Sequence, residues 1–550
     1  MNQVLLSVAF SSRSDLFMFS VFAVLATVLM IFVGYKLLQI MQLAGYKIKG
    51  YFKWFKETKF SYISRLFMLS FLSFSSMLMT NVLLRDFFVD KVLSYFSMMF
   101  FILFCSLFIT NLFTAKQKTP LKYTKRMLRL LIVFIILVAL ITWWLQYVGF
   151  MFIPYLSFGL IAILPLMLPI ILVIAYYITY PLEKLISNSY INRAKKKLDE
   201  YKNLKVIGIT GSYGKTSVKN ILSIILSEKY KVCSTPASYN TPLGLAKTIL
   251  SNLEEKDEIF IAEMGAKQRF DISELCEMTK PEIGIITGVG NQHLLTFGNI
   301  ENVAKTKAEL AKYIEKKNGK LFINVDFLPA RELAKKYKNS INVSVLDIEG
   351  LDICAKNIKT TKNGSSFDLC YDNKVQKCET ILLGEHNISN ILLASRVAIE
   401  LGLSLEEIAV GISKLVTIAH RLEILKSTST YTIIDDAYNS SVEGSKASLN
   451  VLSKFDGKKF VITPGLVELG KEQFNANFEF GKDMASVCDY VIIDSSINYD
   501  AISSGLIFAG FDEDKIIQVV NLSQAVEMLG KYATNNDVVL FENDLPDNYS

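Results

Sequence analysis

The residues of this 550-residue chain best suited to chemistry lie in one segment, Val206–Ser217, which reads VIGITGSYGKTS. An apolar run enters a glycine-containing turn, and the turn ends in Gly-Lys-Thr before a helix-like stretch, Val218–Glu228. The backbone N–H groups of such a turn face nucleotide phosphates, the lysine adds a positive charge, and the threonine hydroxyl can ligate Mg²⁺. The segment therefore predicts a phosphate loop for a nucleoside triphosphate, formed by Gly211, Ser212, Gly214, Lys215, Thr216 and Ser217.

The spacing departs from the usual phosphate-loop pattern at one place. That pattern has a glycine five residues before the second glycine, and this chain has Ile209 there. An ordinary strand–turn–helix is the competing interpretation. Because glycine, lysine and threonine coincide between a predicted strand and a predicted helix, the phosphate loop is favoured.

Five long apolar stretches precede this segment, and each is close to the ~20 residues that a helix needs to span a bilayer. They are Phe17–Tyr35, Leu66–Leu84, Val92–Thr114, Leu130–Phe150 and Phe152–Tyr180. The first is too long for a removable signal peptide, and more spans follow it. Pro154, Pro165 and Pro169 are expected to kink the last span. The chain is thus expected to begin with a helical membrane domain.

Basic residues alternate between the loops of this domain. The loop after the first stretch contains Lys47, Lys49, Lys53, Lys56 and Lys59, and similar groups follow the third and the fifth. The opposite loops are short and nearly balanced in charge. The positive-inside rule then places the N-terminus outside and everything after Tyr180 in the cytoplasm, where ATP is available. The expected location is the cytoplasmic membrane, as a multi-pass protein.

The composition limits the kinds of partner that this chain is expected to bind. The net charge of +7 is mostly explained by membrane topology, and the soluble part lacks the interleaving of basic and aromatic residues typical of nucleic-acid binding. We therefore expect no nucleic-acid partner. The seven cysteines are scattered without a close metal-type pair, which is typical of reduced cytosolic thiols.

Beyond the membrane segment, apolar runs alternate with helical patterns, which predicts parallel α/β sheets. The predicted fold is a helical membrane domain followed by two α/β domains, an ATP-binding central domain and a Rossmann-like C-terminal domain. The expected boundaries are 1–180 for the membrane domain, 181–203 for a linker helix, 204–418 for the central domain and 419–550 for the C-terminal domain. Residues 340–383 are expected to form a small β insertion. The basic face of the linker helix either touches anionic headgroups or is solvated.

Further polar clusters follow the phosphate loop at the ends of predicted strands and on helices. They are Ser238–Gly244, Ile261-Ala262-Glu263-Met264-Gly265-Ala266, Gly288–His293, Lys305–Glu309, Gly384–Asn390, Ala419–Glu423 and Ile434–Ser440. Taken together and in this order, they resemble the Mur ligase family, the ATP-dependent enzymes that join amino acids to peptidoglycan precursors. The resemblance covers about residues 204–550 and is greatest to the D-alanyl-D-alanine-adding (MurF) branch, through Glu263–Ala266 and the Asp436–Asn439 segment.

The resemblance implies a role for each motif residue. ATP would phosphorylate a carboxylate, and an amine would attack the acyl phosphate, so the site must supply cations placed in advance. Lys215 would hold the β- and γ-phosphates, Thr216 and Glu263 would ligate one Mg²⁺, and His293 a second. Arg421 would neutralise transferred phosphoryl charge. Lys307 stands where the family lysine is often carbamylated. Asn387 and Asn390 would contact the adenine side of ATP, and Asp436 the ribose.

Each of these residues also has a structural interpretation. Glu263 could be a cap residue, His293 an ordinary loop residue and Lys307 a solvated lysine beside Glu309. Arg421 could pair with Glu423. His386 is expected to orient the asparagine loop without a chemical role.

The chain also departs from the family. The domain that binds the UDP part of the substrate is missing, and membrane spans stand in its place. Leu295 replaces the usual acid two residues after the histidine, and the end of the chain, from Phe541, lacks the usual basic segment. ATP chemistry is therefore expected to be retained, while recognition of acceptor and amine is expected to differ.

Three functions follow from these features. The first is a membrane-anchored, MurF-like amide ligase with a cell-wall precursor and an amino acid or dipeptide as substrates and with ATP and Mg²⁺ as cofactors. The second is a ligase that acts on a lipid-linked envelope precursor. The third, from another class, is an ATPase that powers transport, against which stand the lack of an internal repeat and the placement of Arg65, Arg85 and Lys91 at span ends.

Overall fold

The structure is a computed structural model that describes residues 13–58, 60–84, 90–114, 120–152, 160–236, 238–290, 294–346, 350–425, 431–438 and 441–543. The described residues form two compact units, one up to Ser187 and one from Asn188 onwards. Each unit has its own hydrophobic core.

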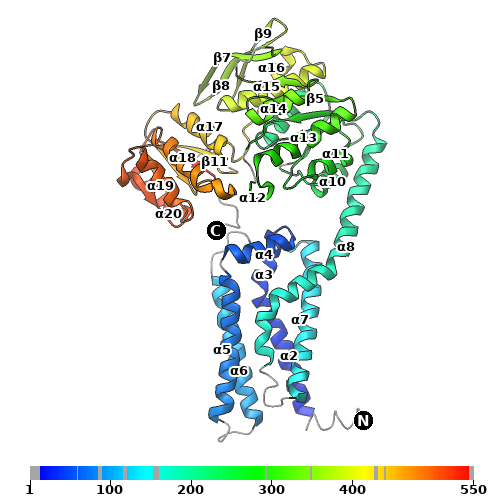
Figure 1. Ribbon diagram of the computed structural model, residues 1–550, viewed down its shortest axis with the longest axis vertical. Helices are drawn as coiled ribbons and strands as arrows, with labels where there is room; N and C mark the ends of the chain where they lie inside the picture. The colour runs from blue at the N-terminus through cyan, green and yellow to red at the C-terminus, as the bar shows by residue number, and fades with distance from the viewer. Residues whose placement is uncertain are drawn as a thin grey trace. The chain divides into compact units, whose positions relative to one another are not determined.

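The first unit is helical (Figure 1). Its elements are α2 (Arg13–Val33), α3 (Tyr35–Leu43), α4 (Ile48–Glu57), α5 (Ser61–Leu84), α6 (Asp90–Thr114), α7 (Lys125–Phe152), the 3₁₀ turn η2 (Leu160–Ile163) and α8 (Leu164–Glu200). By length and composition, five segments could cross a membrane: Ser20–Leu43, Ser61–Met79, Phe96–Phe113, Lys125–Val148 and Leu160–Glu200. Each overlaps one of the predicted apolar stretches. Pro154 lies outside the described residues, and Pro169 and Pro181 lie inside α8.

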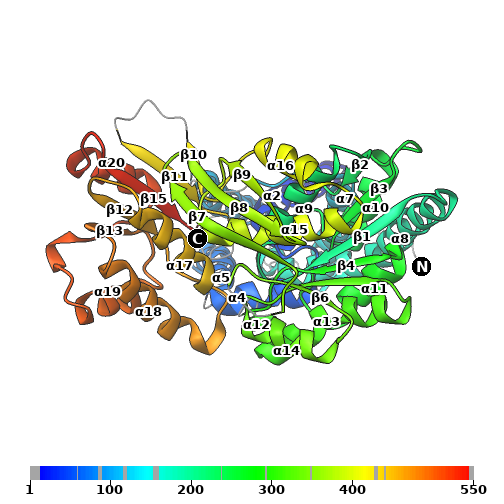
Figure 2. The ribbon, with the colours of Figure 1, turned by 90° about the horizontal axis from the view of Figure 1, so that it is seen from above.

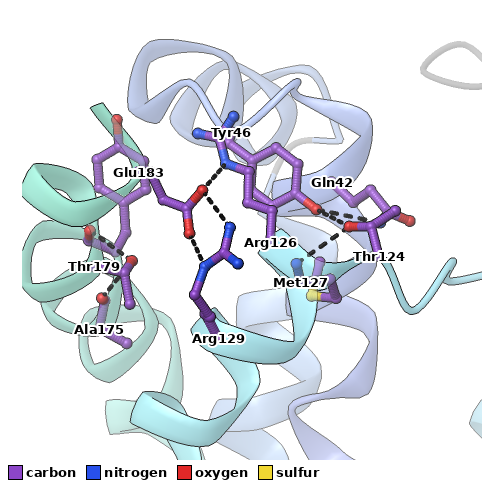
Figure 3. Close-up of polar contacts among 10 residues, drawn as sticks. Gln42, Tyr46, Thr124, Arg126, Met127, Arg129, Ala175, Thr179 and Glu183 are labelled. Carbon is purple, nitrogen blue, oxygen red and sulfur yellow. Dashed lines mark hydrogen bonds and ion pairs between the residues drawn. The ribbon is translucent and has the colours of Figure 1, made fainter. Parts of the chain in front are cut away.

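The helices of this unit are joined at one end by a polar cluster (Figure 3). Arg129 on α7 donates to Glu183 on α8, with 2.9 Å between Nη2 and Oε2, and Arg126 Nε lies 3.9 Å from the same carboxylate. The guanidinium of Arg126 lies 4.0 Å from the ring centre of Tyr46. Gln42 on α3 exchanges two hydrogen bonds with the backbone of Lys122. These contacts hold the C-terminal end of α3 and the N-terminal end of α7, and they hold α7 to the middle of α8, where the predicted cytoplasmic loops are basic.

The predicted linker, 181–203, is helical but not separate, because α8 continues through Pro181 to Glu200. Its last turns belong to the second unit. Ala194 is fully buried in that unit's core, and Lys197 Nζ donates to the carbonyls of Ile249 and Leu253 at 2.9 and 2.6 Å. Lys184, Arg193 and Lys196 of the basic face are exposed, so both alternatives for that face, headgroup contact and solvation, remain predictions.

The second unit begins with a six-stranded parallel sheet in the order β2-β3-β1-β4-β5-β6. Its strands are β1 (Lys205–Thr210), β2 (Val232–Ser234), β3 (Ile259–Glu263), β4 (Ile283–Ile286), β5 (Lys320–Asn324) and β6 (Ile341–Val343). Its helices are α9 (Lys215–Leu226), α10 (Pro242–Ser251), α11 (Asp271–Thr279), α12 (Leu294–Phe297), α13 (Ile300–Lys316), α14 (Leu328–Lys336), α15 (Glu385–Glu400) and α16 (Leu405–Ser413). Separate clusters of buried side chains cover the two faces of the sheet, which explains its continuous apolar strands.

Three antiparallel strands, β7 (Ile353–Thr361), β8 (Gly364–Tyr371) and β9 (Lys374–Thr380), form a separate small sheet. This is the β insertion expected over residues 340–383, except that β6 belongs to the main sheet. Phe367 and Leu369 of β8 are buried in the same cluster as α9 and α15, so the insertion packs on one face of the central sheet.

A second six-stranded sheet follows in the order β10-β11-β15-β12-β13-β14 (Figure 2). Its strands are β10 (Glu423–Leu425), β11 (Thr432–Asp436), β12 (Lys459–Thr463), β13 (Tyr490–Ile493), β14 (Ile516–Gln518) and β15 (Val538–Glu542), and only β10 is antiparallel to its neighbour. Its helices are α17 (Val442–Ser453), α18 (Gln473–Ala485), α19 (Tyr499–Phe508) and α20 (Leu522–Tyr532), with short 3₁₀ turns η3 (Gly470–Glu472) and η4 (Glu513–Lys515). The fold class expected from the sequence is therefore confirmed.

Candidate active site

A cavity of about 480 Å³ opens at the carboxyl ends of the central strands, the usual place for a ligand in an open parallel sheet. One wall is the loop between β1 and α9, including Ser212–Ser217. The opposite wall comes from the second sheet and α17, including Arg421, Asp436 and Glu443. Segments about 200 residues apart therefore meet here, and Tyr438 Oη donates to Ser238 Oγ at 2.8 Å.

The predicted phosphate loop has the backbone that its glycines require. Gly214 precedes α9 with φ +74°, and a Cβ at this position would lie 2.7 Å from Asn390 Oδ1. A Cβ at Gly211 would lie 2.1 Å from Thr287 Oγ1. Side chains at either position would strain the loop or displace its neighbours, so the turn approaches its surroundings closely and leads into the N-terminus of α9.

Lys215 is folded back over the loop, where its Nζ donates to the carbonyls of Gly211 and Ser212 at 2.7 and 3.1 Å. Burial lowers the pKa of Lys215 to about 8; the charge of Glu263 opposes this shift, and that of Arg421 adds to it. The lysine is thus held within the loop by backbone acceptors that a phosphate oxygen could replace.

Glu263, at the end of β3, is almost fully buried and has three partners. Thr216 Oγ1 donates to its carboxylate, 3.1 Å from Oε2, and Asn240 Nδ2 donates to Oε1 at 3.2 Å. Lys219, equally buried, forms an ion pair with Glu263 Oε2 at 3.2 Å. The threonine and the carboxylate predicted as magnesium ligands therefore do lie together, with a lysine as their counter-ion.

The donor set of Thr216 and Glu263 suits Mg²⁺, which prefers oxygen ligands and usually takes one or two carboxylates together with nucleotide phosphates and water. No group of three His, Cys, Asp or Glu side chains within the described ranges could hold a metal by itself. The predicted second ligand, His293, lies outside the described residues.

Lys307 lies on α13 and is buried rather than solvated, so the structure removes that alternative. It does not line the cavity. Burial, and then the nearby charge of Lys215, lower its pKa well below the usual value for lysine. An uncharged amine in this position is the form that can react with CO₂.

Asn387 and Asn390, both on the first turns of α15, line the cavity. Asn387 Nδ2 donates to the carbonyl of Leu383 at 2.8 Å, and Asn390 lies against Gly214. His386 lies beside them; burial lowers its pKa to about 4, so its ring is neutral at pH 7. The asparagine pair thus lines the cavity next to the phosphate loop, with Asn390 against Gly214.

Arg421 and Asp436 are the predicted residues of the C-terminal wall. The guanidinium of Arg421 lies 4.8 Å from the ring centre of Tyr438, and no Arg421–Glu423 ion pair occurs in the described part of the chain, where Glu423 accepts from Thr417 instead. Asp436 accepts from Leu422 N at 3.2 Å and from Ser448 Oγ, and burial raises its pKa to about 6.

Known proteins were compared with this chain. The family model of the Mur ligase middle domain matches residues 209–398, and that of the Mur ligase glutamate ligase domain matches residues 420–542. Together they cover more than half of the chain. The chain belongs to the Mur ligase family.

Two curated proteins similar to this chain are ligases with the same name. The UDP-N-acetylmuramoyl-tripeptide–D-alanyl-D-alanine ligase of Buchnera aphidicola subsp. Baizongia pistaciae is 34% identical over 272 residues, which are 49% of this chain and 58% of the relative. The Bacillus subtilis ligase of that name is 26% identical over 355 residues, 64% of this chain and 75% of the relative. The chain thus spans little more than half the length of the first of these Mur ligases.

Solved structures agree on the fold. MurF ligase from Thermotoga maritima, in complex with ADP, has a TM-score of 0.58 and 26% identity, and the match covers 65% of this chain and 80% of that one. MurF from Acinetobacter baumannii has a TM-score of 0.59 and 24% identity, over 65% of this chain and 77% of that one. The two α/β domains of this Mur ligase therefore have the MurF fold.

Sequence analysis did not single out several residues that form the site. Lys219 lies four residues after Lys215, one helical turn along the same face of α9, and this spacing could have indicated it. Tyr213 and Glu443 line the cavity from opposite walls. No pattern in the sequence pairs these two residues, because 230 positions separate them and only the fold brings them to one cavity.

Proposed function

We propose that this Mur ligase is an ATP-dependent, ADP-forming amide ligase of the MurF type. ATP phosphorylates a substrate carboxylate, an amine attacks the resulting acyl phosphate, and phosphate leaves as the amide forms. One observation carries the proposal: a phosphate loop, a buried Thr216–Glu263 pair and Arg421 surround a single cavity between the two α/β domains.

The residues of the site then have these roles. Lys215 and the backbone of Gly211–Ser217 hold the β- and γ-phosphates. Thr216 and Glu263 hold a Mg²⁺ ion, which supplies charge neutralisation for phosphoryl transfer. His293 remains a proposed ligand of a second ion. Arg421 neutralises phosphoryl charge from the C-terminal wall, and Lys307, which is buried and whose pKa is lowered by that burial, is proposed to be carbamylated.

Nucleoside recognition is proposed for the remaining site residues. Asn387 and Asn390 contact the adenine side, and Asp436 accepts a hydrogen bond from the ribose. These residues would bring one nucleotide into contact with both α/β domains. The acyl phosphate would then form only when the residues of both domains surround the nucleotide.

The names of the relatives suggest the substrates. The acyl substrate is proposed to be a UDP-N-acetylmuramoyl-tripeptide, and the amine D-alanyl-D-alanine. The five apolar helices support a location in the cytoplasmic membrane, with the N-terminus outside and the catalytic domains in the cytoplasm. The function is therefore peptidoglycan precursor synthesis by a membrane-anchored ligase.

Release of ADP by the full-length protein in detergent tests the proposal. ADP release should require both the tripeptide substrate and D-alanyl-D-alanine, and mass spectrometry should detect the amide product. ADP release at the same rate without either substrate would contradict ligation and favour the transport ATPase.

The five apolar helices also favour a second candidate, a ligase whose acyl donor, the carboxylate substrate, is lipid-linked. A membrane-anchored site meets a lipid-linked substrate at a raised effective concentration. The test compares a lipid-linked and a soluble tripeptide substrate, using full-length protein in vesicles. A preference of at least ~10-fold for the lipid-linked form supports this candidate, and equal rates exclude it.

A further inference from the structure

Two cysteines lie directly opposite each other on the small antiparallel sheet. Cys354 on β7 pairs with Cys370 on β8 in the register of the two strands. Fifteen residues separate them in the sequence, and a turn at Lys362 and Asn363 joins the strands. Neither cysteine lines the cavity, so the chemistry proposed above does not use this pair.

The two cysteines also differ from the others in exposure. All seven cysteines of the chain lie within the described residues, and only Cys354 and Cys370 are partly exposed. The other five, Cys105, Cys233, Cys276, Cys378 and Cys488, are buried. Buried structural cysteines are inert, because reagents from solution do not reach them. This pair is therefore the place where the chain offers thiols to a dissolved reagent.

The face of the sheet that carries the pair is turned to solvent. Side chains alternate between the two faces of a strand, and Phe367 and Leu369 of β8 are buried in the core cluster. Cys370 therefore lies on the opposite face. Val375 on β9, which is paired with Cys370 in the register, is 64% exposed. A small molecule can thus approach the two sulfurs from this side.

The two sulfurs are close enough to be joined. Residues directly opposite in an antiparallel pair have Cα atoms about 4.5–5.5 Å apart, which lies within the range of about 4.4–6.8 Å that a disulfide spans. Both cysteines are free thiols. They are hydrogen-bonded to each other, and Cys370 Sγ also donates to the carbonyl of Asp368 at 3.6 Å. A disulfide could therefore form between β7 and β8 without a change of register.

Charged neighbours make the two thiols unequal. Burial, and then the neighbouring Cys354, raise the pKa of Cys370, while the charge of Lys356 opposes this rise. Asp368, which lies between Lys356 and Lys377 in the register, adds to the rise. The thiolate is the form of cysteine that reacts. Since Cys370 keeps its proton more strongly than an ordinary cysteine, Cys354 is expected to react first.

We infer that Cys354 and Cys370 form a reversible dithiol–disulfide site, whose oxidant is a low-molecular-weight disulfide. The inference stands apart from the proposed ligase function, because the pair lies outside the cavity. It assigns to the small sheet a site of covalent modification.

The reaction takes place in two exchange steps. The thiolate of Cys354 attacks one sulfur of the small disulfide, whose S–S bond breaks, and the first small thiolate leaves and takes up a proton. Cys370 then loses its proton and attacks the sulfur of Cys354. The mixed S–S bond breaks, and the second small thiolate leaves and is protonated in turn. Two protein thiols are thereby oxidised to one disulfide, and one small disulfide is reduced to two thiols.

The bridge would lie where the small sheet contacts α15. Asp352, two residues before Cys354, forms an ion pair with Arg396 of α15 at 2.9 Å. The guanidinium of Arg396 lies 5.4 Å from the ring centre of Tyr371, the residue after Cys370. The bridge would remain partly exposed, and exposed disulfides are readily reduced by small thiols. The pair therefore stays reduced in a reducing compartment and is oxidised when small disulfides accumulate.

Oxidised glutathione is the probe for this site. The full-length protein in detergent is incubated with an excess of it, denatured, and titrated with a maleimide. The number of reactive thiols should fall from seven to five. Trypsin cuts between the two cysteines at Lys356, Lys359 and Lys362, so mass spectrometry should detect the peptides 339–356 and 363–374 joined by a disulfide. Reduced glutathione in excess should restore all seven thiols.

Two serine variants separate the pair from the other cysteines. Cys354→Ser should form no linked peptide, and its Cys370 should at most carry one glutathione. Cys378→Ser is the matched control, because Cys378 lies on the adjacent strand β9 but is buried in the core. This control should lose two thiols and give the same linked peptide as wild type.

Several results would overturn the inference. In wild type these are an unchanged thiol count with excess oxidised glutathione, glutathione adducts on both cysteines in place of the linked peptide, and a bridge that forms only between two chains. A bridge that reduced glutathione does not reverse would exclude a reversible site. Loss of two thiols by Cys354→Ser would place the oxidation at other cysteines.

Discussion

At the scale of single residues, the site depends on three buried lysines, Lys215, Lys219 and Lys307. Lys215 and Lys307 both have lowered pKa values because burial disfavours their charged forms. Lys219 is held by an ion pair with Glu263. Burying such groups costs free energy, and they contribute little to folding. The simplest explanation is therefore that they serve the function of the site.

Lys215→Ala is the first test at this scale. The variant should fold and insert normally, since Lys215 bonds only to loop carbonyls, but it should lose at least ~10²-fold in kcat, on the order of 3 kcal/mol of transition-state stabilisation. ADP release measures the effect. Lys247→Ala, on the exposed side of α10, is the control, and wild-type turnover by Lys215→Ala would contradict the phosphate-loop assignment.

His386 gives a prediction about pH. Its ring has a pKa of about 4 when folded, compared with 6.5 for an ordinary histidine. Between these values the unfolded chain binds a proton that the folded chain does not, so stability falls as the pH drops from 6.5 to 4 and changes no further below that. Through this histidine, the free energy of unfolding falls by about 3 kcal/mol in total. Urea titration of wild type and His386→Asn should show this difference, and parallel pH profiles would contradict it.

These residues also show how much of the candidate site could be predicted from the sequence. Lys215, Thr216 and Glu263 could be predicted because each lies next to a strand end within a local motif. Lys307 was open to a solvated interpretation, since burial of a helix face depends on what packs against it. Tyr213 and Glu443 could not be paired, because their meeting depends on the arrangement of two domains.

At the scale of elements, strong local patterns in the sequence were sufficient to predict the longer strands. The shortest strands have no such pattern. The alternation of apolar runs with helical patterns was sufficient to predict strands such as β1, β3, β4 and β5, because both of their faces are buried and their apolar runs are continuous. The strands β2 and β10 have only three residues each, which are too few to show a periodicity. The linker helix expected from residue 181 is a continuation of the helix before it, because α8 runs through Pro181.

The end of α8 supplies the prediction at this scale. Ala194 is fully buried in the core of the central domain, so Ala194→Asp should place an unpaired carboxylate there and cost about 3 kcal/mol or more. Asn192→Asp makes the same change in charge at an exposed position of the same helix and should have little effect. Pulse proteolysis in urea compares the two, and equal stabilities would show that α8 does not support the second unit.

At the scale of the whole molecule, the chain combines a helical unit, with five segments long and apolar enough to cross a membrane, with two domains of the MurF fold. The first unit is joined to the second unit by one helix, α8, which is apolar at its start and basic towards its end. The polar cluster of Arg126, Arg129 and Glu183 lies on the same side as the basic loops. Under the positive-inside rule, this distribution of charge would place the two α/β domains in the cytoplasm, which is the proposed orientation.

Cysteine labelling in a cysteine-free background tests that orientation. Val520 is 83% exposed on the C-terminal domain, so a cysteine there should stay unlabelled by an impermeant maleimide in intact cells and react after the membrane is permeabilised. A cysteine at Asn2 should react in intact cells, because the positive-inside rule places the N-terminus outside. Labelling of Val520→Cys before permeabilisation would reverse the topology. It would also separate the phosphate loop from cytoplasmic ATP, and the ligase function could not then be retained.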